Sequence, residues 1–311
     1  DEHTSRGLGD VYKRQMLFRP IRMLADRFNT LQMGMVSSAR VFDLLDNDEI
    51  IHQSGNNQLE SFNGQISFKN VHFSYDGRSK VFDGLSLDVR SGETIAVVGP
   101  TGAGKTSLIN LISRYYEFQE GEILLDGMDI RSISLSSLRS KVAVVLQDVF
   151  LFNTSVLENI TLGKEEIELE QVIEAAKKVG VHGFISQLDG SYEFQVKERG
   201  GVLSSGQRQL ISFLRAYICK PDLLILDEAT SSVDSGAEEL IQKATKVITK
   251  DRTSIIIAHR LSTIKNADRI LVIDRGKIIE EGNHNTLIQK KGHYFDLYEN
   301  QFLKEESILP S

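Results

Sequence analysis

Cysteine is nearly absent from this chain of 311 residues, since Cys219 is the only one. A single cysteine excludes a disulfide framework, and without a cluster of cysteines and histidines the sequence offers no structural zinc site. The default expectation for such a chain is a reducing, cytosolic environment.

Long apolar runs are absent as well. No window of 18 or more apolar residues occurs, and the best run, VAVVLQDVFLF at 142–152, is too short and too interrupted to cross a bilayer. The first residues contain no apolar stretch of the kind found in a signal peptide. The chain as given is therefore expected to be soluble.

Basic residues do not outnumber acidic ones. Lysine and arginine total 36 against 43 aspartates and glutamates, a formal net charge of −7. Because wrapping a nucleic-acid backbone requires a basic surface, no nucleic-acid partner is expected. With 25% charged and 41% hydrophobic residues, the composition is typical of an ordinary globular chain of one or two domains.

The opening segment, DEHTSRGLGDVYKRQ, has neither an initiating methionine nor a helical or strand periodicity. We interpret residues 1–15 as a non-native or disordered leader of cloning, adapter or wrong-frame origin. The alternative is a genuine loop.

From Met16 the pattern changes to an apolar seam with steps of four and three, which predicts one long amphipathic helix over residues 16–46. A rod of about 45 Å cannot bury its own seam, so it needs partner helices or must fold back onto a neighbouring domain. The seam consists of Leu17, Ile21, Leu24, Phe28, Leu31, Met35, Ser38, Phe42 and Leu45.

A segment rich in glycine, asparagine, glutamine and serine follows at 47–64 and is predicted to be a linker. Beyond it, the alternating pattern of 65–75 predicts a half-exposed strand with 85–89 as its neighbour. Fully apolar strands then alternate with helical stretches, which predicts an α/β fold with a parallel sheet covered on both faces. These strands are 94–98, 142–146, 223–227, 253–258 and 269–273. Between Ser155 and Arg215 only helical patterns occur, so we expect a helical subdomain inserted into the core.

The strand at 94–98 runs directly into GPTGAGKTS, so Gly99–Thr106 satisfies the phosphate-loop pattern GxxxxGK[ST] in the strand, loop and helix context that the motif requires. The glycines let successive backbone N–H groups and the helix N-terminus point at a polyphosphate. Lys105 is expected to reach the β- and γ-phosphates, and the Thr106 hydroxyl to hold Mg²⁺. The nucleotide-binding residues of this segment are Gly99, Pro100, Thr101, Gly102, Ala103, Gly104, Lys105, Thr106 and Ser107.

Two adjacent carboxylates end the later strand LLILDE. Asp227 is placed to bind the Mg²⁺ shell, and Glu228 to orient and polarise an attacking water. No guanine-reading segment of the NKxD type occurs, which disfavours a GTPase. Tyr75, upstream of the loop, offers a stacking face for a base, although at a strand end such a ring is more often a packing residue.

Taken in order, GPTGAGKTS, Gln147, LSSGQ at 203–207, LLILDE, SSVD at 231–234 and His259 resemble the motifs of ATP-binding cassette (ABC) ATPases over nearly all of 65–303. KERG at 197–200 and the segment from Leu17 to Asp46 resemble the exporter branch, in which a last membrane helix leads into the nucleotide-binding domain. The resemblance implies a P-loop NTPase core with a parallel sheet, an antiparallel β subdomain and an inserted helical subdomain at 65–303, followed by a tail at 304–311.

The resemblance also implies roles for residues that face the domain's own nucleotide. Tyr75 would stack on adenine, and Gln147 would join the Mg²⁺ shell and sense the membrane domain. Glu228 would be the catalytic carboxylate, with His259 contacting the γ-phosphate. Lys105 belongs with Glu228, His259 and Gln147 to the set of catalytic residues that the resemblance implies.

Other matching residues would act across a dimer. Ser204, Gly206 and Gln207 match the signature segment that closes over the γ-phosphate of an opposite subunit, and Asp234 matches a loop residue that communicates across the dimer. The usual LSGGQ is LSSGQ here, which puts the backbone approach at Ser205 in doubt, because serine resists positive φ. By itself, LSSGQ also predicts a helix cap with Ser204 as N-cap.

These features predict the ATP-binding and ATP-hydrolysing subunit of an exporter. The expected cofactors are ATP and Mg²⁺. The expected partners are a second nucleotide-binding domain, identical or paralogous, and the protein's own transmembrane domain. The location would be the cytoplasmic face of an inner or plasma membrane. The alternatives are a soluble ABC ATPase acting on DNA or ribosomes and a non-hydrolysing regulatory module.

Overall fold

The structure is a computed structural model that describes residues 2–46, 55–197, 200–228 and 235–302. It divides into two compact units, Asp1–His52 and Gln53–Ser311. The boundary between them falls inside the segment predicted as a linker.

The first unit is one helix, α1 (Glu2–Leu45), with Pro20 inside it. The predicted helix is therefore present, but it starts at Glu2, in contrast to the expectation that residues 1–15 have no regular structure. Its described apolar side chains, among them Ile21, Leu24 and Phe28, are exposed. Within the part of the chain that the structure describes, neither α1 nor any other helix has the length and apolar character needed to span a bilayer.

A six-stranded sheet forms the centre of the second unit, in the order β10-β9-β3-β8-β7-β6. All its pairs are parallel except β9 with β10. The strands are β3 (Thr94–Val98), β6 (Val142–Val145), β7 (Leu223–Asp227), β8 (Thr253–Ile257), β9 (Arg269–Asp274) and β10 (Lys277–Gly282). This confirms the predicted parallel core. The strand β10 was not predicted, because its side chains alternate between exposed and half-buried and so form no continuous apolar run.

Successive side chains of a strand point to opposite sides, so a fully apolar strand presents an apolar surface on both faces of the sheet. Both faces are covered by packed apolar side chains. On β3, Ala96 and Val98 pack into one buried cluster and Ile95 and Val97 into the other. The same division holds along β7 and β8, so two apolar cores lie back to back with the sheet between them.

One core joins the sheet to α2 (Lys105–Ile112) and to a second, antiparallel sheet of order β2-β1-β4-β5. This sheet confirms the expected antiparallel subdomain, although only its first two strands were predicted. Its strands are β1 (Ile66–Ser74), β2 (Lys80–Val89), β4 (Glu120–Leu125) and β5 (Met128–Asp129).

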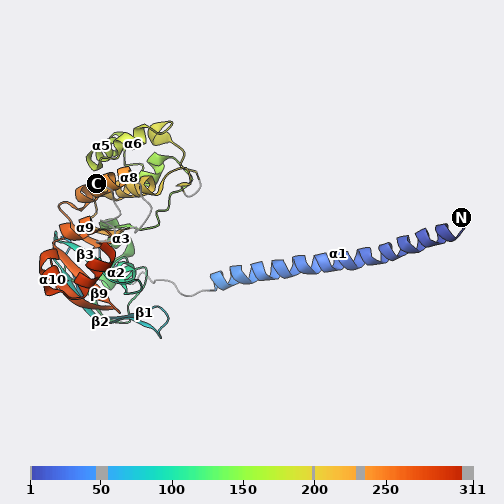
Figure 1. Cartoon of the computed structure of the whole chain (residues 1–311), viewed down its shortest axis with the longest axis horizontal. Helices are drawn as coiled ribbons and strands as arrows, with labels where there is room; N and C mark the ends of the chain where they lie inside the picture. Colours follow the sequence, from blue (N-terminus) through green and yellow to red (C-terminus); the bar gives the residue numbers. More distant parts are fainter. Residues whose placement is uncertain (1, 47–54, 198–199, 229–234, 303–311) are drawn as a thin grey trace. The chain divides into compact units, whose positions relative to one another are not determined.

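The other core carries helices, which confirms the predicted helical subdomain. Figure 1 shows α5 and α6 at one end of this unit and β1 and β2 at the other. The helices of the unit beyond α2 are α3 (Leu135–Lys141), α4 (Val156–Thr161), α5 (Leu169–Val179), α6 (His182–Ser186), α7 (Ser205–Ile218), α8 (Ser235–Thr249), α9 (Leu261–Asn266), α10 (His284–Lys290) and α11 (His293–Leu297).

The described part of the predicted linker, residues 55–64, packs against the core. Leu59 and Phe62 are buried in the cluster under the antiparallel sheet, and Asn57 forms a bridge with Ile133. The linker prediction rested on the polar composition of the segment, and two apolar anchors separated by polar residues leave no periodic signal.

We expect Ile225→Ala to lower the free energy of unfolding by about 2–5 kcal/mol, because Ile225 is fully buried on β7 and its truncation leaves a cavity. Chemical denaturation of the purified variant measures this change. Ile279→Ala, on the exposed face of β10, is the matched control and should change it by less than about 0.5 kcal/mol. Equal effects would contradict the assigned core.

Candidate functional site

The carboxyl ends of three neighbouring parallel strands, β3, β8 and β7, meet at one edge of the central sheet. Val97 of β3 pairs with Ile257 of β8, and Ile257 pairs with Asp227 of β7. Hydrogen bonds continue this register past the strand ends, from Ala258 N to Val97 O at 3.1 Å and from Glu228 N to Ile257 O at 3.1 Å. The segments that follow these strands are therefore brought side by side.

The loop after β3 has a backbone that favours glycine. Gly99, Gly102 and Gly104 have φ values of 152°, 80° and 107°. A Cβ on Gly99 would lie 2.0 Å from the Ile273 carbonyl oxygen, so the chain passes too close to β9 for any side chain. Gly104 is the N-cap of α2 and supplies no side-chain cap, which leaves the first N–H groups of the helix available to an anion.

Lys105 is buried at the start of α2 and folds over its own loop. Its Nζ donates to the carbonyl oxygens of Gly99 at 2.7 Å and Pro100 at 2.9 Å. Burial lowers the pKa of Lys105, and the negative charge of Asp227 opposes this shift. The lysine thus lies close to the loop and to the acidic end of β7.

Asp227 and Asp148 share this acidic region. Burial raises the pKa of Asp227; the positive charge of Lys105 lowers it and the negative charge of Asp148 raises it further. Asp148 was not among the predicted site residues. Its position directly after Gln147, at the end of β6, was the signal that could have identified it.

The oxygen donors at this edge fit Mg²⁺, which prefers oxygen ligands. The Thr106 side chain is exposed in the first turn of α2, Asp227 ends β7, and Gln147 is exposed after β6. Among the described residues, no three histidine, cysteine or acidic side chains gather into a metal-holding group. A Mg²⁺ shell completed by phosphate oxygens and water needs only one or two protein carboxylates, so this donor set is sufficient.

Glu228 does not point into solvent. Only 3% of the residue is exposed, and its Oε1 accepts a hydrogen bond of 2.5 Å from the Thr263 hydroxyl. Its Oε2 accepts from the backbone N–H groups of His259 and Arg260, each at 3.3 Å. Burial raises the pKa of Glu228, while the Thr263 hydrogen bond, the charge of Arg260 and the two N–H groups lower it.

His259 lies between β8 and α9 and is half-buried. Its backbone N–H donates to Glu228 Oε2. Burial lowers the pKa of its imidazole, and the positive charge of Lys105 lowers it further. The next residue, Arg260, reaches Glu238 of α8 with 3.6 Å between Nη1 and Oε1. The predicted loop lysine, both carboxylates and the histidine are therefore in one neighbourhood.

Tyr75 lies beside the first turns of α2 and is 48% exposed. Its hydroxyl forms hydrogen bonds with the Ser107 hydroxyl at 2.9 Å and with the Asn110 amide at 3.0 Å. Phe73 and Tyr116 each hold the ring in an edge-to-face contact with 4.7 Å between centroids. The ring is thus fixed near the phosphate loop, with part of its surface open.

LSSGQ begins α7, as the capping pattern predicts. The Ser204 hydroxyl accepts from Gln207 N at 3.2 Å, and Gln207 Oε1 accepts from Ser204 N at 2.9 Å. Ser205 lies in the first helical turn without positive φ, so the anticipated backbone strain does not arise. Gly206 is buried in the same turn, while Asp234 lies outside the described residues.

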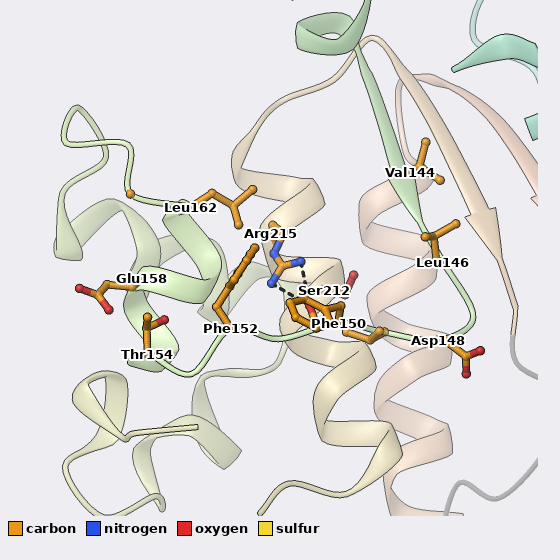
Figure 2. A pocket seen from close by; sticks show the side chains of 12 residues that line it. Val144, Leu146, Asp148, Phe150, Phe152, Thr154, Glu158, Leu162, Ser212 and Arg215 are labelled. Atoms are coloured by element: carbon orange, nitrogen blue, oxygen red, sulfur yellow. Dashed lines mark hydrogen bonds between the residues drawn. The ribbon is translucent and has the colours of Figure 1, made fainter. Parts of the chain in front are cut away.

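A cavity of about 720 Å³ follows the end of β6, and its lining contains none of the predicted site residues. Figure 2 shows Phe150 and Phe152 beside the guanidinium of Arg215, which donates to the Phe150 carbonyl oxygen at 3.4 Å. Both rings are exposed and in edge-to-face contact. The cavity's apolar lining consists of Val144, Leu146, Val149, Phe150, Phe152 and Leu162.

Comparisons with known proteins find similar sequences over most of this chain. The family described as "ABC transporter" matches residues 82–231, which include the phosphate loop, LSSGQ and the end of β7. An uncharacterised ABC transporter ATP-binding protein of Bacillus subtilis, YknV, is 48% identical over 92% of this chain and 48% of its own length. A fatty acid ABC transporter ATP-binding/permease protein of Mycobacterium bovis is 46% identical over 89% of this chain and 44% of its own length.

A solved structure is similar in fold. The structure of a bacterial Atm1-family ABC exporter with ATP bound aligns with a TM-score of 0.78 and 37% identity, covering 92% of this chain and 51% of that one. The chain therefore spans about half the length of the proteins it matches.

We expect Gly99→Ala to be more destabilising than Gly102→Ala. Alanine at position 102 meets no atom within 4 Å and costs about 1–2 kcal/mol for its left-handed backbone. Alanine at position 99 also collides with the Ile273 carbonyl. Denaturant unfolding of both variants measures the difference, and equal losses would show that the loop does not pass close to β9.

Proposed function

The chain belongs to the ATP-binding cassette (ABC) transporter family, and from this premise we propose that it is the ATP-hydrolysing part of an exporter. The observation that carries the proposal is the meeting of Lys105, Asp227, Glu228 and His259 at the edge where β3, β7 and β8 end. A triphosphate on the loop would face Lys105, Asp227 and His259, and the Glu228 carboxyl would reach it only after leaving its hydrogen bond to Thr263.

ATP binding uses the loop and the fixed ring. The uncapped N–H groups of α2 and the loop glycines receive the phosphates, and Lys105 Nζ exchanges the carbonyls of Gly99 and Pro100 for phosphate oxygens. The open part of the Tyr75 ring stacks on the base. Thr106, Asp227 and Gln147 would hold a Mg²⁺ ion, whose positive charge would offset that of the phosphates.

Glu228 and His259 have separate roles in hydrolysis. Glu228 accepts a proton from the attacking water and His259 contacts the γ-phosphate. Since Glu228 is buried against the start of α9 in this conformation, its carboxyl must move before it can meet that water.

A second nucleotide-binding domain completes the site in this proposal. The capped start of α7, with Ser204, Gly206 and Gln207, closes over the γ-phosphate held by the other copy. ATP then favours the closed dimer and ADP does not, and this difference in affinity is convertible into motion. Asp234 is proposed to act across the same dimer.

The apolar cavity after β6 is proposed to receive a helix of the protein's own membrane domain. Phe150 and Phe152 are exposed at an apolar groove, which is the kind of surface that binds the apolar face of an amphipathic helix. The cavity lining includes Leu146 and Asp148, the two neighbours of Gln147 in the chain. Similar proteins that combine ATP-binding and permease parts support this choice. The domain would then lie on the cytoplasmic face of the membrane.

We expect Glu228→Gln to retain ATP binding and lower turnover by roughly a hundredfold or more, because the amide cannot accept the proton of the attacking water. Phosphate release measures turnover, and size-exclusion chromatography with ATP should show a persistent dimer. Unchanged hydrolysis would refute the role of Glu228, and an association state that never responds to ATP would refute the dimer.

We expect Phe150→Ala combined with Phe152→Ala to weaken capture of a separately produced membrane domain by about tenfold or more, because both rings are anchors of the groove. Ile279→Ala, an exposed apolar residue on β10, is the control and should bind normally. Basal ATP hydrolysis of the chain should be unchanged. Normal capture by the double variant would place the membrane domain elsewhere.

A further inference from the structure

The contact between Glu228 and Thr263 joins residues 35 positions apart in the chain. Thr263 is itself buried, in α9, and its hydroxyl donates the shortest of the three hydrogen bonds that Glu228 accepts. The other two come from backbone N–H groups at 3.3 Å. Thr263 therefore supplies the only one of these bonds that a side-chain substitution can remove.

In this position Glu228 is not available to a water molecule. Both of its carboxyl oxygens accept hydrogen bonds from the protein, and only 3% of the residue is exposed. A general base must lie within hydrogen-bond reach of the proton that it removes. The conformation is therefore a resting one with respect to hydrolysis.

The same short segment carries His259, which is proposed to contact the γ-phosphate. His259, whose imidazole interacts with the charge of Lys105, precedes Thr263 by four residues, and both contact Glu228. Between them, Arg260 reaches Glu238 on α8. A shift of this segment when phosphate meets His259 would therefore alter the bonds that hold the carboxyl.

We propose that Thr263 is a positioning residue that holds the Glu228 carboxyl in its resting place and must release it before ATP is cleaved. This proposal rests on the proposed ATPase function. It assigns to the hydroxyl a restraining role, so that its removal favours the released carboxyl. Since a hydrogen bond to a carboxylate is among the stronger ones in proteins, the equilibrium should shift by about tenfold.

The first test compares ATP hydrolysis by Thr263→Val, Thr263→Ser and Thr245→Val in the full chain. Thr263→Val should raise kcat several-fold and leave KM for ATP unchanged, and Thr263→Ser, which retains the hydroxyl, should restore the original kcat. Thr245→Val is the matched control: its hydroxyl is buried on α8 and donates to the Ile241 carbonyl oxygen, without touching Glu228. It should leave kcat unchanged.

A fall in kcat for Thr263→Val would overturn the proposal, because Thr263 would then hold Glu228 in its productive place. An unchanged kcat would overturn it as well. If the parent chain shows no hydrolysis at all, the proposed function fails, and a measurement that needs no activity still decides the role of Thr263.

That measurement is carbodiimide modification of carboxyl groups, mapped by mass spectrometry of peptides, in protein without nucleotide. Glu228 should be protected in the parent chain and in Thr263→Ser, and modified several-fold faster in Thr263→Val or, should the valine variant not fold, in Thr263→Ala. Thermal unfolding identifies variants that have lost their fold. Equal modification of Glu228 in all folded variants would overturn the proposal.

Discussion

The parallel register of β3, β8 and β7 is the constraint on which the site depends. Because Val97, Ile257 and Asp227 are aligned across the three strands, the segments that leave them emerge at one edge of the sheet. Their chemistry is carried by residues far apart in sequence, and only this pairing brings them together. A slip by one residue would move every side chain of a strand to the opposite face and disrupt the close packing of both apolar cores.

Burial then changes the properties of the charged groups at this edge. The pKa of Lys105 is lowered and those of Asp227 and Glu228 are raised, in each case chiefly by removal from water. The charges of Asp227 and Lys105 oppose each other's pKa shifts, because each favours the charged form of the other. The two packed cores therefore hold the titratable groups of this edge close together and partly out of water.

The same sheet links the nucleotide edge to the apolar cavity. β6 pairs with β7 and leads into Gln147, Asp148 and then Phe150 and Phe152. Arg215 of α7 fixes this segment through hydrogen bonds to the carbonyl oxygens of Asn159 and Phe150. Since α7 begins with the Ser204 cap, one helix extends from the segment proposed to meet a second copy to the groove proposed to meet the membrane domain.

The sequence by itself determined the local features: the apolar strands of the central sheet, the glycine-rich loop that opens α2, the cap at Ser204 and the helical insertion. Each follows from periodicity or backbone preference within a few residues. Only the tertiary structure decided that Glu228 is buried against Thr263 and that Leu59 and Phe62 anchor a polar segment to the core. Those contacts join distant parts of the chain, and no local pattern specifies which partner a side chain meets after the sheet has assembled.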